Sequence, residues 1–146
     1  MKTRKNLAPV EHIIDCNLEP NSTLSWKIVR HIKGGIINFD VNKVTLYLSE
    51  KQQKGEIQGE ALMRELNGLP VMNSNVLTYL IHHPEIIPKK WKNKKIYFWG
   101  TISSGEVYTF VHCLCWFDGK WVVRASSPDR YFGRNCPAIL YDYKNP

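Results

Sequence analysis

The sequence predicts a single α+β domain, in which an antiparallel or mixed β-sheet with a C-terminal β-meander carries two short helices packed on it. Three observations lead to this fold class. Residues 96–125 contain three β-prone runs separated by glycine turns, residues 59–83 contain apolar residues at helical spacing, and alternating runs precede the helices. Because the helices lie between two β regions, we expect both to cover one face of the sheet.

Length and composition fit one domain without a membrane span. The chain has 146 residues, 43% of them hydrophobic, which is ordinary for one globular domain. We predict a loose basic arm at residues 1–9 and the domain at 10–146. No signal peptide or long apolar run is visible, so we expect a cytoplasmic protein with reduced thiols, no structural metal, no cofactor and no membrane contact. The four cysteines are Cys16, Cys113, Cys115 and Cys136.

The N-terminal part is predicted to be mainly β-structure. Residues 10–16 form a possible first strand and residues 17–22 a turn. Residues 26–32 alternate in polarity, and Gly34-Gly35 separates them from the apolar residues 36–39, so a hairpin is expected there. Residues 44–48 predict another strand, and residues 51–55 a polar loop.

Two helices are predicted in the middle of the chain. Leu62 and Leu66 lie four residues apart in the first, over residues 59–67, which Gly68 terminates. Asn73 is a suitable N-cap for the second, because its side-chain oxygen can accept a free backbone N–H. Pro84 excludes the preceding residue from helical geometry, so the second helix ends there.

The last third is predicted to be a β-meander. Strands are expected at residues 96–103, 106–117 and 120–125, with turns at Ser104-Gly105 and Asp118-Gly119. Residues 107–116 are apolar on both alternating sides, which is typical of a central strand covered on both faces. Residues 138–141 are a possible last strand.

Four segments together resemble a family of small uncharacterised bacterial proteins. They read VTLYLSEKQ (44–52), LPVMNSNVL continuing to HPEIIP (69–88), YFWGTI (97–102) and HCLCW (112–116). The likeness covers residues 24–140. It implies a bacterial or mobile-element source and an intact single domain. It implies no reaction, so no catalytic residue is transferred.

The strongest binding signal is a basic run between the second helix and the meander. The net charge is +7, and residues 71–146 contain ten basic but only five acidic side chains. Lysines could neutralise phosphates, and the tryptophan within the run could stack on an unpaired base. Alternatively, the lysines are a solubilising loop and the tryptophan folds inward. The candidate residues for binding nucleic acid or another polyanion are Lys89, Lys90, Trp91, Lys92, Lys94 and Lys95.

Other chemistry-bearing residues give weaker signals. Cys113 and Cys115 point the same way in a strand, but their spacing does not suit the turn-based pairs of structural zinc sites. Paired histidines at 82–83 suit the negative end of a helix. Aromatic side chains in the meander could stack on bases or pack in the core; they are Tyr97, Trp99, Tyr108, Phe110, Trp116 and Trp121.

Two function classes follow. Small size, basic charge and the lack of a linear catalytic signature favour a small binding or inhibitory module of bacterial or phage origin, which engages nucleic acid or an acidic protein surface. The alternative is a small hydrolase or nuclease with a non-linear active site, built from residues such as His112, Asp129 and Arg130. The sequence leaves open whether the protein is an enzyme.

Overall fold

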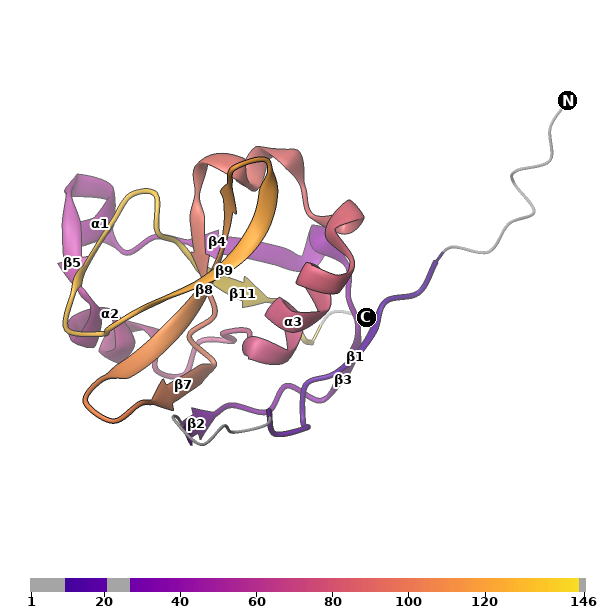
Figure 1. Ribbon diagram of the computed structural model, residues 1–146, viewed down its shortest axis with the longest axis horizontal. Coiled ribbons are helices and arrows are strands. Elements are labelled where there is room, and N and C mark those ends of the chain that lie inside the picture. The colour runs from indigo at the N-terminus through magenta and orange to yellow at the C-terminus, as the bar shows by residue number, and fades with distance from the viewer. Residues whose placement is uncertain (1–9, 21–26, 145–146) are drawn as a thin grey trace, which may run out of the picture.

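The computed structural model describes residues 10–20 and 27–144 as an α+β domain built on a curled, mixed seven-stranded sheet (Figure 1). The strand order is β2-β7-β8-β6-β11-β4, and β9 pairs with β8. The strands are β2 (Lys27–His31), β4 (Val44–Tyr47), β6 (Lys95–Tyr97), β7 (Thr101–Ser104), β8 (Thr109–Phe117), β9 (Lys120–Ser126) and β11 (Ala138–Tyr141). The predicted arm at residues 1–9 lies outside the described residues, and no helix within them could span a membrane.

Two small two-stranded sheets flank the main sheet. One pairs β1 (Ile13–Asp15) with β3 (Ile36–Asn38), and the other pairs β5 (Glu56–Gln58) with β10 (Tyr131–Gly133). The hairpin predicted at Gly34-Gly35 is therefore wrong, because β3 pairs with β1 whereas β2 pairs with β7. Gly35 does adopt a positive φ of 80°, but its carbonyl accepts from Cys16 N–H rather than closing a β2–β3 turn. Long-range pairing overrode the local turn signal.

The predicted meander is confirmed, with one break and a shorter second strand: β8 begins at Thr109 rather than at residue 106, because Gly105 N–H donates to the Tyr108 carbonyl in the turn after β7. Strands β7, β8 and β9 pair antiparallel in chain order, and Asp118 and Gly119 form the β8–β9 turn with φ values of 51° and 78°. The strand expected over residues 96–103 instead divides into β6 and β7. Gly100, between them, passes close to the backbone of Met72. A Cβ at this position would lie 2.7 Å from the Met72 carbonyl oxygen, so only glycine fits. Strand β8 is central, with β6 and β7 along one edge and β9 along the other.

Both predicted helices are present, as α2 (Gly59–Leu66) and α3 (Ser74–His82), and the strands expected at residues 44–48 and 138–141 are also confirmed. The polar loop expected at residues 51–55 is wrong, because Glu50–Lys54 forms α1. Ser49 and Gln52 make a reciprocal capping box, in which each side-chain oxygen accepts from the other's backbone N–H at 3.0–3.1 Å. This Ser-x-x-Gln pattern was readable from the sequence.

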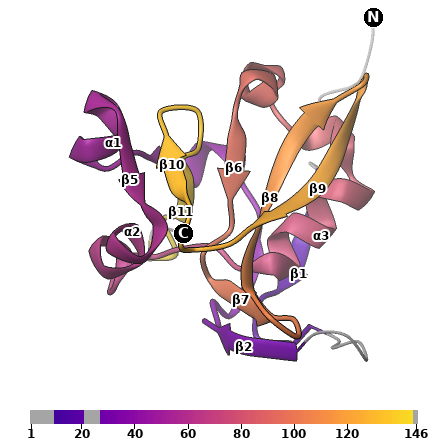
Figure 2. The ribbon, with the colours of Figure 1, turned by 60° about the vertical axis from the view of Figure 1, so that its left-hand side comes forward.

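The two longer helices cover opposite faces of the sheet, so the expectation of one shared face is wrong (Figure 2). Leu80 of α3 packs in one core with Leu114, whereas Leu62 of α2 packs in a second core with Cys113. The reason lies in residues 70–72, which connect the helices and pair with β11: Met72 N–H donates to the Ile139 carbonyl, and Tyr141 N–H donates to the Pro70 carbonyl. Because this segment lies in the plane of the sheet, the chain comes to it from α2 on one face and continues to α3 on the other.

Candidate functional site

The basic run forms a 3₁₀ helix and then enters the sheet. Residues Lys89–Asn93 form the 3₁₀ helix η4 after Pro88, and Lys95 is the first residue of β6. Lys94 is half-buried, and the other lysines of the run are exposed. No ion pair to these lysines occurs within residues 10–20 and 27–144, where the one salt bridge joins His83 and Glu85. Their positive charge is therefore not neutralised by a neighbouring carboxylate in the described structure.

Trp91 does not belong to this surface. Its side chain is 3% exposed and lies in the core beneath α3, with Leu80 and Ile96. It cannot reach a base in solution without leaving that core. Of the two alternatives for this residue, the structure shows the inward one. The tryptophan instead fixes η4 to the sheet and holds the lysines on either side of it outward.

The structure places part of the run in a groove beside the β8–β9 hairpin. The groove has a volume of about 370 Å³ and runs between η4 and the end of β8. Lys95 pairs with Cys115 at the last rung of the β6–β8 ladder, so the edge of β8 beyond that rung stays open. The lining residues are Lys92, Asn93, Lys94, Lys95, Cys115, Trp116, Phe117, Arg124 and Asn135, with no carboxylate among them. We call this the cationic groove.

Two cations lie over aromatic rings in the cationic groove. Lys92 Nζ is 3.9 Å from the centroid of the Trp116 ring, and Arg124 Cζ is 4.6 Å from that of Phe117. Trp116 also contacts Trp121 edge-to-face at 5.2 Å. Such cation–π contacts position charged groups beside apolar surface. Phe117 nevertheless remains 55% exposed, so a large part of its surface is available to a ligand.

Two lysines of the run lie away from this groove. Lys90 lines a neighbouring groove next to Val44 and Leu46 of β4, and Lys89 lines neither, whereas Lys94 lines both grooves. A 3₁₀ helix has three residues per turn, so successive lysines point in different directions. The run is therefore not one continuous patch. Arg124 is not among the site residues predicted from the sequence, because β9 reaches the groove only through its pairing with β8.

The meander aromatics divide between core and surface. Tyr97 and Trp99 are buried and pack around Phe132, as the core interpretation predicted. Tyr108 is exposed at the β7–β8 turn, and Phe110, Trp116 and Trp121 are half-buried. Only Trp116 of the predicted set lines the cationic groove, together with Phe117, which the prediction did not include.

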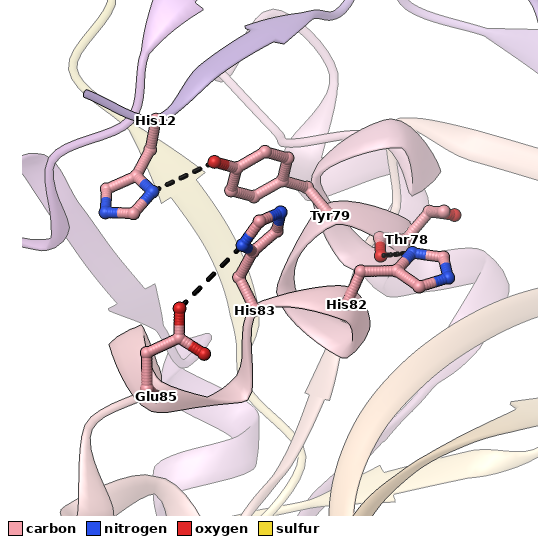
Figure 3. Close-up of polar contacts among 6 residues, drawn as sticks. All are labelled: His12, Thr78, Tyr79, His82, His83 and Glu85. Atoms are coloured by element: carbon pink, nitrogen blue, oxygen red, sulfur yellow. Dashed lines mark hydrogen bonds and ion pairs between the residues drawn. The ribbon is translucent and has the colours of Figure 1, made fainter. Parts of the chain in front are cut away.

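A second polar cluster lies at the end of α3, where His82 and His83 terminate the helix (Figure 3). The His82 ring donates to the Thr78 carbonyl at 2.9 Å, a structural role of the kind expected for histidine at a helix C-terminus. His83 stacks on Tyr79 at 4.1 Å between ring centroids and lies 3.8 Å from a Glu85 oxygen. Figure 3 shows these contacts continuing to the segment before β1 through the Tyr79 hydroxyl, which lies 2.9 Å from His12 Nδ1. The cluster thus fastens β1 to α3.

The three residues of the hydrolase alternative lie in two different grooves. His112 of β8 faces a groove of about 840 Å³ between α3, β1 and the sheet, whose surface is mainly apolar, and burial lowers the pKa of its imidazole. Asp129 and Arg130 line a separate groove beside Phe110. The Asp129 carboxylate accepts from the Ser127 hydroxyl at 2.6 Å within its own turn. The structure does not bring the three side chains together.

The four cysteines are free thiols, and three of them are buried. Burial raises the pKa of Cys16 to about 11 and that of Cys113 to about 12, and it also raises the pKa of the half-buried Cys136. Within residues 10–20 and 27–144, no group of three or more His, Cys, Asp or Glu side chains is placed to hold a metal ion.

We expect slow alkylation of the native thiols. Because the thiolate is the nucleophile, raised pKa values and burial should leave Cys16 and Cys113 unmodified by iodoacetamide at about pH 8, while the more accessible Cys136 reacts slowly. Peptide mass spectrometry over a time course measures each site, and the denatured chain, in which every thiol reacts, is the control. Rapid modification of Cys113 in the native protein would contradict the buried position of β8.

The geometry of the cationic groove is the principal basis for a functional proposal. Most of its lining residues lie on η4, β6, β8 and β9. Its positive charge comes from two segments about 30 residues apart in the sequence. Comparison of the chain with models of protein families, with curated proteins and with solved structures finds no match.

Proposed function

We propose that this protein is a small nucleic-acid-binding module, and that the cationic groove holds the phosphate backbone of its ligand. The observation that carries the proposal is the groove itself, in which Lys92, Lys94, Lys95 and Arg124 converge without an acidic neighbour in the lining. Phosphates bound there would release condensed counterions, the main source of sequence-independent affinity for nucleic acid.

The aromatic lining favours nucleic acid over an acidic protein surface. A purely electrostatic partner needs only the lysines, whereas Trp116 and Phe117 place apolar rings among them. An aromatic ring beside a cation suits nucleic acid, because a nucleotide presents a phosphate for the cation and a flat base for the ring a few ångströms apart. The buried Trp91 keeps η4 in place, so the cations are positioned before a ligand arrives.

The test is the double substitution Lys92→Glu with Lys94→Glu. We expect it to weaken binding to short oligonucleotides at least about tenfold, and to reduce the slope of log affinity against log salt by about two units, because each lost phosphate contact reduces it by about one. Fluorescence anisotropy from about 50 to 200 mM salt measures both quantities. Thermal unfolding of the variant should stay close to wild type, because the two side chains lie outside the core.

A matched control separates the groove from net charge. Lys51→Glu with Lys54→Glu makes the same charge change on α1, outside the groove, and should leave most of the affinity in place. An equal loss in both double variants would show that the site is not the groove. Absence of binding at low salt, or equal competition by polyglutamate, would refute nucleic-acid recognition.

A further inference from the structure

We infer that the cationic groove takes single-stranded nucleic acid, with an unpaired base stacked on Phe117. The inference rests on the proposed function and names the class of ligand for the same site. It replaces the stacking residue expected from the sequence, Trp91, with one from another segment of the chain. The reasons are the exposure of this ring, the cations around it and the shape of the groove.

Phe117 is an exposed aromatic residue at the end of the β8–β9 hairpin. It is the last residue of β8, next to the Asp118-Gly119 turn, and lies opposite Lys120 in the hairpin. Arg124 lies over its ring at 4.6 Å, yet 55% of the residue stays in contact with solvent. An exposed phenylalanine at a hairpin end, with a cation over its ring, offers a stacking surface rather than a core contact.

Several cations lie near Phe117. Lys94 and Lys95 line the same groove, Lys92 lines it from above the Trp116 ring, and Lys120 is the residue paired with Phe117 on β9. Strand β8, which ends at this hairpin, lies against η4. A base on the ring would therefore have Lys120 and Arg124 of β9 beside it, and Lys94 and Lys95 in the same groove, for the neighbouring phosphates.

The shape of the groove favours an unpaired strand. Its volume of about 370 Å³ is at the small end of the range for ligand pockets, about 300–1,000 Å³, so it suits a nucleotide rather than a wide helix. In a duplex the faces of the bases are covered by their neighbours, and only a splayed base can stack on an aromatic ring. The neighbouring helix η4 has only five residues, too short to read a major groove as a recognition helix does.

The experiment compares Phe117→Ala with wild type on oligothymidine and on a duplex of equal length. We expect wild type to bind the single strand at least about tenfold more tightly, and Phe117→Ala to lose about 5- to 150-fold on the single strand, since one stacked base contributes about 1–3 kcal/mol. The salt slope should not change, because the ring carries no charge. Phe117→Trp, which keeps a stacking surface, should retain binding.

Tyr131→Ala is the matched control, because Tyr131 is an exposed aromatic residue on β10, outside the groove. It should leave affinity for the single strand unchanged. Equal affinity for single strand and duplex, or an unchanged affinity in Phe117→Ala, would overturn the inference while the salt-dependent contribution of Lys92 and Lys94 could still stand. Absence of salt-dependent binding to either nucleic acid would remove the proposed function as well.

Discussion

Replacing Asn73 with alanine should lower the free energy of unfolding by about 3 kcal/mol. The side chain is 1% exposed, and its oxygen accepts from Asn75 N–H at 3.0 Å to cap α3. Its amide group donates to the carbonyls of Cys16 and Ile32, each at 2.9 Å. Alanine would remove the cap, worth about 1 kcal/mol, and leave two carbonyls without this donor, at a cost of about 1–3 kcal/mol.

Asn73→Asp separates the two roles of this side chain. Aspartate keeps an oxygen for the helix cap, but it removes both donors and places a carboxylate against two carbonyl oxygens. We therefore expect a loss at least as large as for alanine. Urea unfolding followed by tryptophan fluorescence measures each variant, with the exposed Asn42→Ala as control, where a change below about 0.5 kcal/mol is expected. An Asn73→Asp protein as stable as wild type would show that only the cap matters.

Replacing Phe98 with alanine should lower the free energy of unfolding by about 3–5 kcal/mol. This residue is 0% exposed and lies at the break between β6 and β7, where its N–H donates to the His112 carbonyl at 3.0 Å. Truncation removes the buried ring and leaves a cavity in the core that α3 covers. A loss of this size is a large part of the ordinary stability of a domain, about 5–15 kcal/mol.

Phe117→Ala is the control for this variant, because it truncates the same residue type at an exposed position. Its effect on unfolding should stay below about 1 kcal/mol, the range of an exposed cation–π contact. Phe98→Leu, which keeps much of the side-chain volume, should fall between the two. Denaturant unfolding at one temperature measures all three. Equal losses for Phe98→Ala and Phe117→Ala would contradict the placement of Phe98 in the core.

Much of the candidate site was within reach of the sequence, but its boundaries were not. The density of lysine between residues 89 and 95 identified the segment that carries the charge. It did not show that η4 turns Lys90 away from Lys92, or that Trp91 is buried. Phe117 and Arg124 join the site through the β8–β9 ladder. The Asp118-Gly119 turn predicted that hairpin, whereas nothing local predicted that η4 would lie beside its end.

The sequence by itself determined the elements whose signals depend on a few neighbouring residues. Asn73 before an apolar helix, glycine in the Asp118-Gly119 turn and the double apolar pattern of β8 each specified local structure, because capping, φ and alternation act over about four residues. Only the tertiary structure decided that β2 pairs with β7, that the Gly100 backbone lies against the Met72 carbonyl, and that α2 and α3 lie on opposite faces of the sheet. These features depend on which segments bury each other's apolar surface and hydrogen-bond groups, and that competition involves residues far apart in the chain.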